Sequence, residues 1–127
     1  MKLRIRGNSI RLRLTQSEVT QLAADRSVES AICFGTENSD QLKYSVSTTS
    51  NYEVTTAQFR NSEITVLVPK ALVKEWASSD TIGIEANQTT HAGELEILIE
   101  KDFACLKARP GEDDLDTFAN PLAAKQG

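Results

Sequence analysis

The sequence predicts an α+β domain, mostly β, built from two consecutive ββαββ halves with one short helix in each. Three observations lead to this prediction. Basic and apolar residues alternate around a small polar turn near the start of the chain, the first short helix has a capping signal, and the whole pattern recurs at a fixed offset. At 127 residues, of which 39% are hydrophobic and 25% charged, the chain has the size and composition of one globular domain.

The first predicted element is a β-hairpin. In residues 2–6 and again in residues 10–14, apolar side chains fall on one face and basic side chains on the other. The intervening Gly7-Asn8-Ser9 has turn chemistry, because Gly and Asn tolerate a positive φ. Alternation, turn and alternation together predict two antiparallel strands.

A short helix and a second hairpin complete the first half. Thr15 and Glu18 have the spacing of a capping box, which predicts a helix over residues 16–24. Two further strands are expected over residues 28–34 and 41–47, with a loop rich in small and polar residues between them.

The second half repeats the first at an offset of 54 residues, or 53 in the last strand. The aligned pairs include Ile10 with Ile64, Leu12 with Val66, Leu22 with Trp76, Val28 with Ile82 and Val46 with Ile99. We interpret this as an internal duplication, with repeats over about residues 2–50 and 56–103. Residues 1–109 are predicted to form a single domain, and the acidic, proline-containing residues 110–127 a flexible tail.

Two segments of the chain carry a resemblance to known families. Arg6-Gly7-Asn8-Ser9-Ile10-Arg11-Leu12, followed in the second half by Val68-Pro69-Lys70-Ala71-Leu72-Val73-Lys74-Glu75-Trp76, resembles the swapped-hairpin module of AbrB- and MazE-type regulators and antitoxins. This resemblance implies a swapped-hairpin-like β-barrel with tandem pseudo-twofold halves. It also implies DNA binding through basic hairpins. The opening MKLRIRGNSIRLRLT and the later EKDFACL resemble a small bacterial family with a domain of unknown function, which implies no catalytic residue and no ligand.

Positive charge is concentrated at the start of a chain whose net charge is −4. Residues 1–50 hold seven Lys/Arg and five Asp/Glu, whereas the rest of the chain holds seven and thirteen. Alternation places five cations on one hairpin face, where each could neutralise a phosphate or another anion. The predicted nucleic-acid or anion-binding residues are Lys2, Arg4, Arg6, Arg11 and Arg13.

The same cations have an internal explanation. A strand bearing acids beside the hairpin would supply cross-strand ion pairs, and the acids in question are Glu94, Glu96, Glu100 and Asp102. A third arrangement has the acidic tail lying across the hairpin, anchored by Leu115 and Phe118. If DNA is the partner, a homodimer is expected, because the equivalent positions of the second hairpin hold one cation instead of five: Thr56, Gln58, Arg60, Thr65 and Leu67.

No catalytic motif or metal-ligand spacing is found in the sequence, so no catalytic residue, metal or cofactor is predicted. Cys33 and Cys105 lie in apolar settings and are expected to be free, packed thiols, and His91 is expected at a loop tip. No apolar run has the length of a membrane helix, so no membrane partner is expected.

These observations favour a small cytoplasmic, non-enzymatic binding or regulatory protein whose partner is unidentified, with DNA and an acidic protein surface as the candidates. The alternative is a DNA-binding transcriptional regulator or antitoxin that uses the basic N-terminal hairpin. A second alternative is an enzyme with an unrecognised site.

Overall fold

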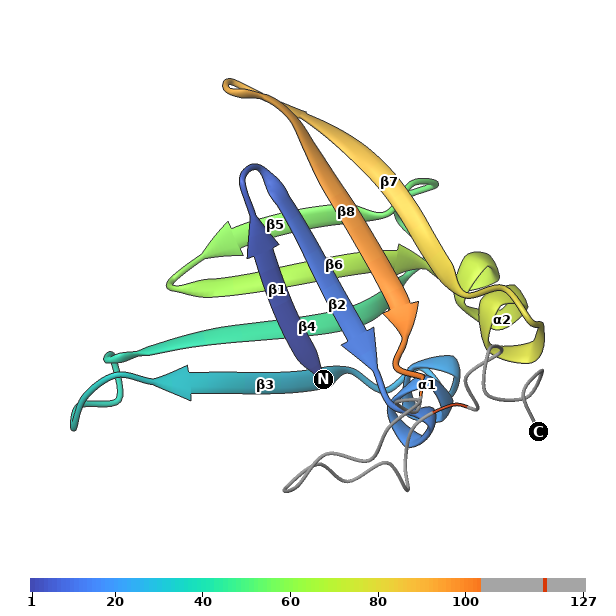
Figure 1. Ribbon diagram of the computed structural model, residues 1–127, viewed down its shortest axis with the longest axis horizontal. Helices are drawn as coiled ribbons and strands as arrows, with labels where there is room; N and C mark the ends of the chain where they lie inside the picture. Colours follow the sequence, from blue (N-terminus) through green and yellow to red (C-terminus); the bar gives the residue numbers. More distant parts are fainter. Residues whose placement is uncertain (104–117, 119–127) are drawn as a thin grey trace.

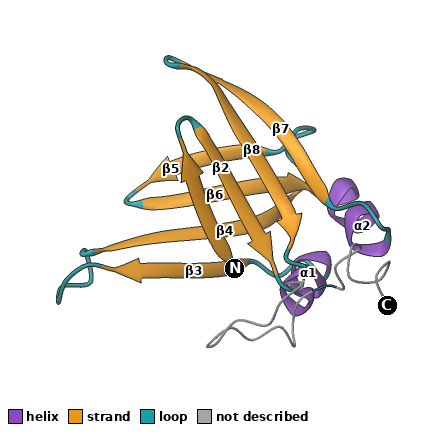
Figure 2. Ribbon diagram, viewed as in Figure 1, coloured by secondary structure: helices purple, strands orange, loops and turns teal. Residues whose placement is uncertain are grey.

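The computed structural model describes residues 1–103 and Phe118, and they form two four-stranded β-sheets and two short α-helices (Figures 1 and 2). The prediction of an α+β, mostly β, fold is therefore confirmed. Apart from Phe118, the predicted tail over residues 110–127 lies outside the described residues. The elements are β1 (Lys2–Arg6), β2 (Ser9–Leu14), α1 (Gln16–Ala23), β3 (Val28–Cys33), β4 (Gln41–Thr49), β5 (Thr56–Arg60), β6 (Glu63–Pro69), α2 (Lys70–Ser78), β7 (Gly83–Thr90) and β8 (Gly93–Lys101).

The hairpins that open the two halves, β1–β2 and β5–β6, both close through two-residue turns. Gly7 has a φ of 55°, and in the second turn Asn61 and Ser62 have φ values of 51° and 60°. Positive φ at these positions is the mark of the hairpin turns whose twist matches that of the flanking strands. The small polar residues of both turns therefore fix the register of the strands beside them.

The helices begin in different ways. The Glu18 backbone N–H donates to Thr15 Oγ1 at 3.4 Å, and the Thr15 N–H donates to Glu18 Oε1 at 2.9 Å, so the predicted capping box is confirmed. α2 instead follows directly on Pro69, the last residue of β6, which has no side chain to cap the helix. Neither helix of the described part is long and apolar enough to cross a bilayer.

Each sheet takes one hairpin from each half of the chain. The strand order is β1-β2-β8-β7 in the first sheet and β5-β6-β4-β3 in the second, so exchanging the halves converts one order into the other. The central strands are parallel in both sheets, and they pair in equivalent registers: Leu12 lies opposite Ile99, and Val66 lies opposite Val46. These are the positions that the offsets of 54 and 53 residues align.

The sheets are separate, and the strand pairs of the described residues do not join them into a closed barrel. They are packed face to face with crossed strands, and both helices lie at one end of the molecule (Figure 1). The closed barrel implied by the family resemblance is therefore not formed.

The last hairpin corrects the predicted alignment of Val28 with Ile82. Val28 pairs with Val46, whereas Ile84 pairs with Ile99, so Ile84 is the structural counterpart of Val28. Ile84 is 9% exposed and Ile82 is 50% exposed. The reason is that the Ile82 carbonyl accepts hydrogen bonds from Trp76 Nε1 at 2.9 Å and from the Lys101 N–H at 3.0 Å, which tie the residue to α2 and β8 by its backbone.

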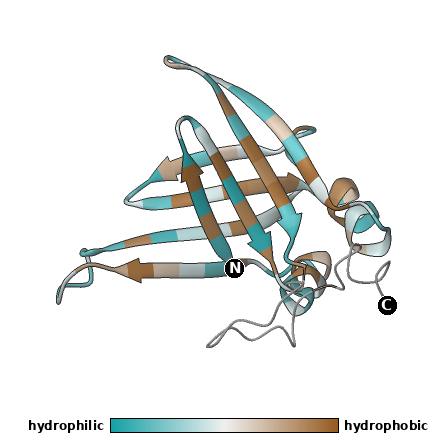
Figure 3. Cartoon of the chain, in the orientation of Figure 1, coloured by the Kyte–Doolittle hydropathy of each residue, from teal (hydrophilic) through white to brown (hydrophobic). Residues whose placement is uncertain are grey.

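The core lies between the sheets at the end covered by the helices. Brown, apolar bands run along the strands in Figure 3, and the fully buried side chains come from both sheets and both helices. The largest are Leu12, Leu14, Leu22, Val46, Val66, Val68, Val73, Trp76, Ile97 and Ile99. Towards the opposite end the burial declines, and Ile32 and Phe34, apolar residues of the strand predicted over residues 28–34, are 48% and 73% exposed.

Candidate anion-binding surface

The five predicted cations lie on one face of the β1–β2 hairpin. In the observed register Lys2 lies opposite Arg13 and Arg4 lies opposite Arg11, while Arg6 lies opposite Ser9. Residues directly opposite each other share a face of the sheet, and the apolar residues of the same strands contribute to the core on the other face. The structure therefore brings all five together on the outer face of the first sheet.

The turn of this hairpin is held to the neighbouring strand β8. The Asn8 side chain donates to the Glu94 carbonyl at 2.9 Å, and the Glu96 N–H donates to the Asn8 carbonyl at 3.1 Å. Within the turn, Ser9 Oγ donates to the Arg6 carbonyl at 2.7 Å. These bonds fix the end of the hairpin at which Arg6 lies.

Part of the positive charge is paired internally, because β8 runs parallel to β2 and carries acids on the same face. Arg13 Nε donates to Glu100 Oε1 at 2.6 Å, and Arg11 Nε lies 3.6 Å from the same oxygen. Lys2 Nζ lies 3.3 Å from Asp102, a carboxylate that is 8% exposed. The prediction of internal ion pairs is confirmed for Glu100 and Asp102.

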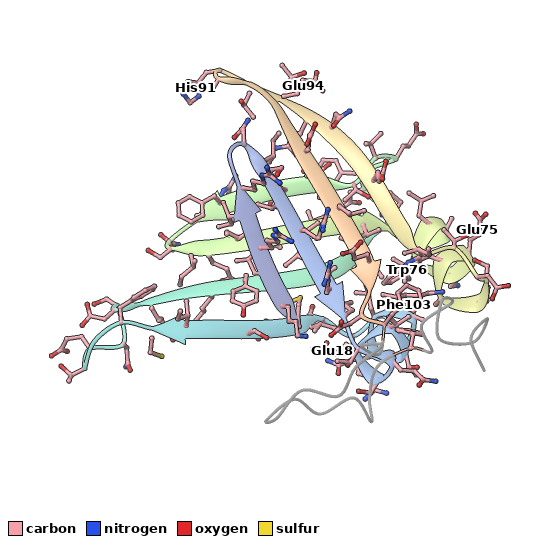
Figure 4. All side chains as sticks on the ribbon, viewed as in Figure 1. Glu18, Glu75, Trp76, His91, Glu94 and Phe103 are labelled. Carbon is pink, nitrogen blue, oxygen red and sulfur yellow. The ribbon has the colours of Figure 1, made fainter. Side chains whose placement is uncertain are left out.

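The other two predicted acids do not reach the cations. Glu96 lies opposite Ser9 in the register, and Glu94 lies at the tip of the β7–β8 hairpin (Figure 4). Within the described part of the chain, neither carboxylate forms an ion pair.

Arg4 and Arg6 are exposed, and no carboxylate of the described residues lies within ion-pair distance of either. Together with Ser9 and Arg11 they line a depression of about 110 Å³. Arg4 and Arg11 are direct cross-strand neighbours, an arrangement of like charges that is unfavourable and that an additional anion would stabilise. This depression, lined by Arg4, Arg6, Ser9 and Arg11, is called the arginine cradle below.

A second, larger groove of about 360 Å³ separates the basic and acidic parts of the same face. Its polar lining runs from Ser9 and Arg11 on β2, across Glu96 on β8, to Glu85 and Asn87 on β7. The outer face of the first sheet thus changes from positive to negative across its width, and an anion is favoured only at the β1 side.

The β5–β6 hairpin has the same register but a different surface. Arg60 lies opposite Glu63, and Thr56 and Gln58 lie opposite Leu67 and Thr65. The predicted positions therefore occupy the equivalent places, with one cation among them. A second arginine cradle is not present on the described part of this hairpin.

Phe118 lies at the helical end of the molecule, where it lines a depression together with residues of α1 and α2, and it is not among the residues of the arginine cradle. Its N–H donates to the Asp102 carbonyl at 2.8 Å, and its ring packs edge-on against Phe103 at 6.0 Å between centroids. Lys101 is buried there, with Nζ 5.4 Å from the Phe118 ring and 5.9 Å from that of Trp76. The predicted anchoring of the tail over the hairpin is wrong for Phe118, and Leu115 lies outside the described residues.

The cysteine and histidine side chains of the described residues are not among those that line the arginine cradle. Cys33 is free and exposed, which corrects its predicted burial, because β3 ends there, where the sheet extends beyond the core; Cys105 is not among the described residues. His91 lies at the exposed tip of the β7–β8 hairpin, as predicted (Figure 4). In residues 1–103 and Phe118, no group of three His, Cys, Asp or Glu side chains is placed to hold a metal ion.

The pKa of Asp25 is lowered by its neighbours. The Lys70 ammonium, 3.2 Å from Asp25, donates a hydrogen bond that holds the pKa of this aspartate below its ordinary value, and the Thr48 hydroxyl adds a second hydrogen bond. Asp25 follows α1, and Lys70 begins α2. The lowered pKa therefore reflects an ion pair between the end of α1 and the start of α2, which we call the junction of the helices.

Sequence reasoning missed two polar contacts that the fold depends on. Gln88 of β7 bonds through its side chain to the backbone of Ala57 in β5, and the buried Lys101 donates to the Ser79 carbonyl at 2.7 Å. Alternation places Gln88 on the inward face of β7, an unusual position for an amide, and this is the signal that could have identified it.

Comparison with protein-family models gives a match over residues 1–122 to the family described as Family of unknown function (DUF7009). Neither the curated proteins nor the solved structures include a significant match.

Proposed function

The chain belongs to the DUF7009 family, and from this premise we propose that it is a small, non-enzymatic binding or regulatory protein that engages an anionic partner through the arginine cradle. The observation that carries the proposal is that Arg4 and Arg6, beside Arg11, form no ion pair with any described residue. Guanidinium groups are planar donors that match carboxylate and phosphate oxygens.

The internal ion pairs support a narrow site in place of the whole basic face. Lys2, Arg11 and Arg13 have carboxylate neighbours, so an incoming anion would compete with Glu100 and Asp102 for them. Arg4 and Arg6 have no carboxylate neighbour in the described part of the chain, so an anion would displace none of its carboxylates from them. We therefore expect these two arginines to dominate binding.

The test is the replacement of both free arginines, Arg4→Glu with Arg6→Glu, in the full chain. Retention on an immobilised polyanion such as heparin should be lost at a salt concentration that retains the unmodified protein. The matched control is Arg26→Glu with Lys74→Glu, which changes the net charge equally at two exposed positions remote from the cradle. Equal loss in both variants would show that net charge alone governs retention, and the cradle would be rejected.

A second candidate is a DNA-binding regulator or antitoxin with a single-chain form of the swapped-hairpin module. The exchange of hairpins between the halves favours it, because each sheet contains one hairpin from each half. With one arginine cradle per chain, a homodimer would supply the second basic hairpin. This candidate requires duplex DNA to bind with a steep salt dependence and the protein to be dimeric on the DNA. We also propose a cytoplasmic location, which agrees with the free thiol of Cys33.

A further inference from the structure

The edge of the first sheet formed by β1 has unused hydrogen-bonding groups. A two-residue turn makes Arg6 and Ser9 a hydrogen-bonded pair, and hydrogen-bonded and non-hydrogen-bonded pairs then alternate along the hairpin. The N–H and C=O groups of Leu3 and Ile5 consequently point away from β2. No described residue forms a hydrogen bond with them.

The second half of the chain shows what such an edge position accepts. Ala57 in β5 is the counterpart of Leu3, and both of its backbone groups are bonded to the side chain of Gln88. The Ala57 N–H donates to Gln88 Oε1 at 2.8 Å, and Gln88 Nε2 donates to the Ala57 carbonyl at 2.9 Å. A carboxamide thus takes the place that the peptide groups of a neighbouring strand would take.

At the β1 edge no side chain of the described residues makes such bonds. The alignment of Val28 with Ile84 makes Ile32 the counterpart of Gln88, and an isoleucine cannot form these hydrogen bonds. Side chains that could contact a partner nevertheless lie on both faces of the sheet at this edge. Arg4 and Arg6 lie on the outer face, and Ile5, 59% exposed, lies on the inner face.

We propose that the open edge of β1 is a docking site for an extended acidic segment of another protein, which adds to the first sheet as a fifth strand. The proposal rests on the function proposed for the arginine cradle and names its partner class. Because side chains alternate, the segment would place acidic residues beside Arg4 and Arg6 and apolar residues beside Leu3 and Ile5. Its recognisable feature is alternation of acidic and apolar residues.

Charge disfavours the simplest competing occupant, the β1 edge of a second copy. Pairing two β1 strands would bring their cations together without neutralising them, and like charges on neighbouring strands are destabilising. Duplex DNA would satisfy Arg4 and Arg6 but has no peptide groups for Leu3 and Ile5. An acidic strand satisfies both requirements.

The experiment measures binding of synthetic ten-residue peptides of alternating Glu and Val to the full chain. Three forms are compared: unmodified, N-methylated on every Glu, and N-methylated on every Val. In an added strand, one of these two sets of N–H groups faces β1 and the other faces solvent. We expect one methylated peptide to bind at least about tenfold more weakly and the other to bind like the unmodified peptide.

Two measurements on the protein side locate the strand. Amide hydrogen exchange at Leu3 and Ile5 should slow when the unmodified peptide binds, while exchange at Arg4, already bonded to β2, should change little. Ile5→Pro removes a donor at the open edge, and it should weaken the unmodified peptide about as much as methylation does. If this variant does not fold, the exchange measurement on the unmodified protein decides the matter.

The outcomes separate this proposal from the proposed function. Equal binding of all three peptides and of polyglutamate, lost in the Arg4→Glu, Arg6→Glu variant, would overturn strand addition and leave the cradle as an anion site. Failure of every peptide and of duplex DNA to bind would overturn both. Binding of duplex DNA without the peptide would overturn the partner class. Tighter peptide binding after neutralising Glu112, Asp113, Asp114 and Asp116 would assign the edge to the chain's own tail and overturn an external partner.

Discussion

Glu100 accepts a hydrogen bond from Arg13 and lies close to Arg11, and its side chain is 15% exposed. A carboxylate in this position has two effects. It stabilises the fold by neutralising neighbouring cations on β2, and it withdraws those cations from any external anion. Glu96, four residues earlier on the same strand and face, forms no ion pair among the described residues, so it serves as the reference position.

Glu100→Gln is therefore expected to lower the free energy of unfolding while strengthening anion binding. Both arginines are about 40% exposed, so solvent screens the pairs and we expect a loss of about 1 kcal/mol. Urea unfolding and heparin retention measure the two effects. The control, Glu96→Gln, makes the same charge change and should leave the stability nearly unaltered. If both variants behave alike, Glu100 has no special role.

The junction of the helices allows a prediction about pH. The Lys70 ammonium lowers the pKa of Asp25, so the stabilisation from this pair is fully present above the ordinary aspartate pKa and is lost as the pH falls through the lowered value. Lys70→Met should raise the pKa of Asp25 towards its ordinary value, as followed by NMR titration of the carboxyl carbon. Lys74→Met should raise it less, because Lys74 acts on Asp25 only through the weaker long-range charge interaction.

At the scale of the elements, the edge strands β5 and β1 are counterparts in the two halves, but they differ in the hydrogen bonds made to their open edges. Gln88 joins the edge strands β7 and β5, whereas no described side chain bonds to the open groups of β1. A partly buried carboxamide that makes both hydrogen bonds stabilises the contact between β7 and β5. Loss of this side chain would leave the N–H and C=O groups of Ala57 without these partners.

Gln88→Ala should lower the free energy of unfolding by about 1–3 kcal/mol, since two hydrogen bonds are lost at a half-buried site. Amide hydrogen exchange at Ala57 should accelerate more than exchange elsewhere in β5. Asn87→Ala, at the neighbouring exposed position on the opposite face, is the control and should have little effect. Unchanged exchange at Ala57 would mean that packing alone holds β5 against β7.

The elements themselves could largely be predicted from local patterns. Alternation and turn chemistry identify β1 and β2, and the capping box identifies the start of α1, because these signals arise within a few residues. The pairing of β2 with β8 joins residues almost ninety positions apart, so the sequence could suggest the ion pairs of Glu100 but could not select it over Glu94. The misplacement of Ile82 has the same origin, since its backbone bonds to Trp76 and Lys101 are tertiary contacts.

At the scale of the whole molecule, the exchange of hairpins makes each half depend on the other. An isolated half would contain two hairpins that belong to different sheets, and the buried cluster draws on both halves. Neither half has a core of its own within the described residues. Unfolding is therefore expected to be a single cooperative transition.

This dependence can be tested with Trp76, the only tryptophan, which lies in the second half and is 1% exposed. Leu12→Ala creates a cavity in the first half and should cost about 2–5 kcal/mol. If the halves form one cooperative unit, the urea midpoint seen by Trp76 fluorescence must fall as far as the midpoint seen by far-UV circular dichroism. Val66→Ala, at the equivalent position of the second half, should shift both signals together as well. A Trp76 transition that stays in place in the Leu12→Ala variant would show that the second half folds independently, and the exchanged-hairpin core would then not be the unit of stability.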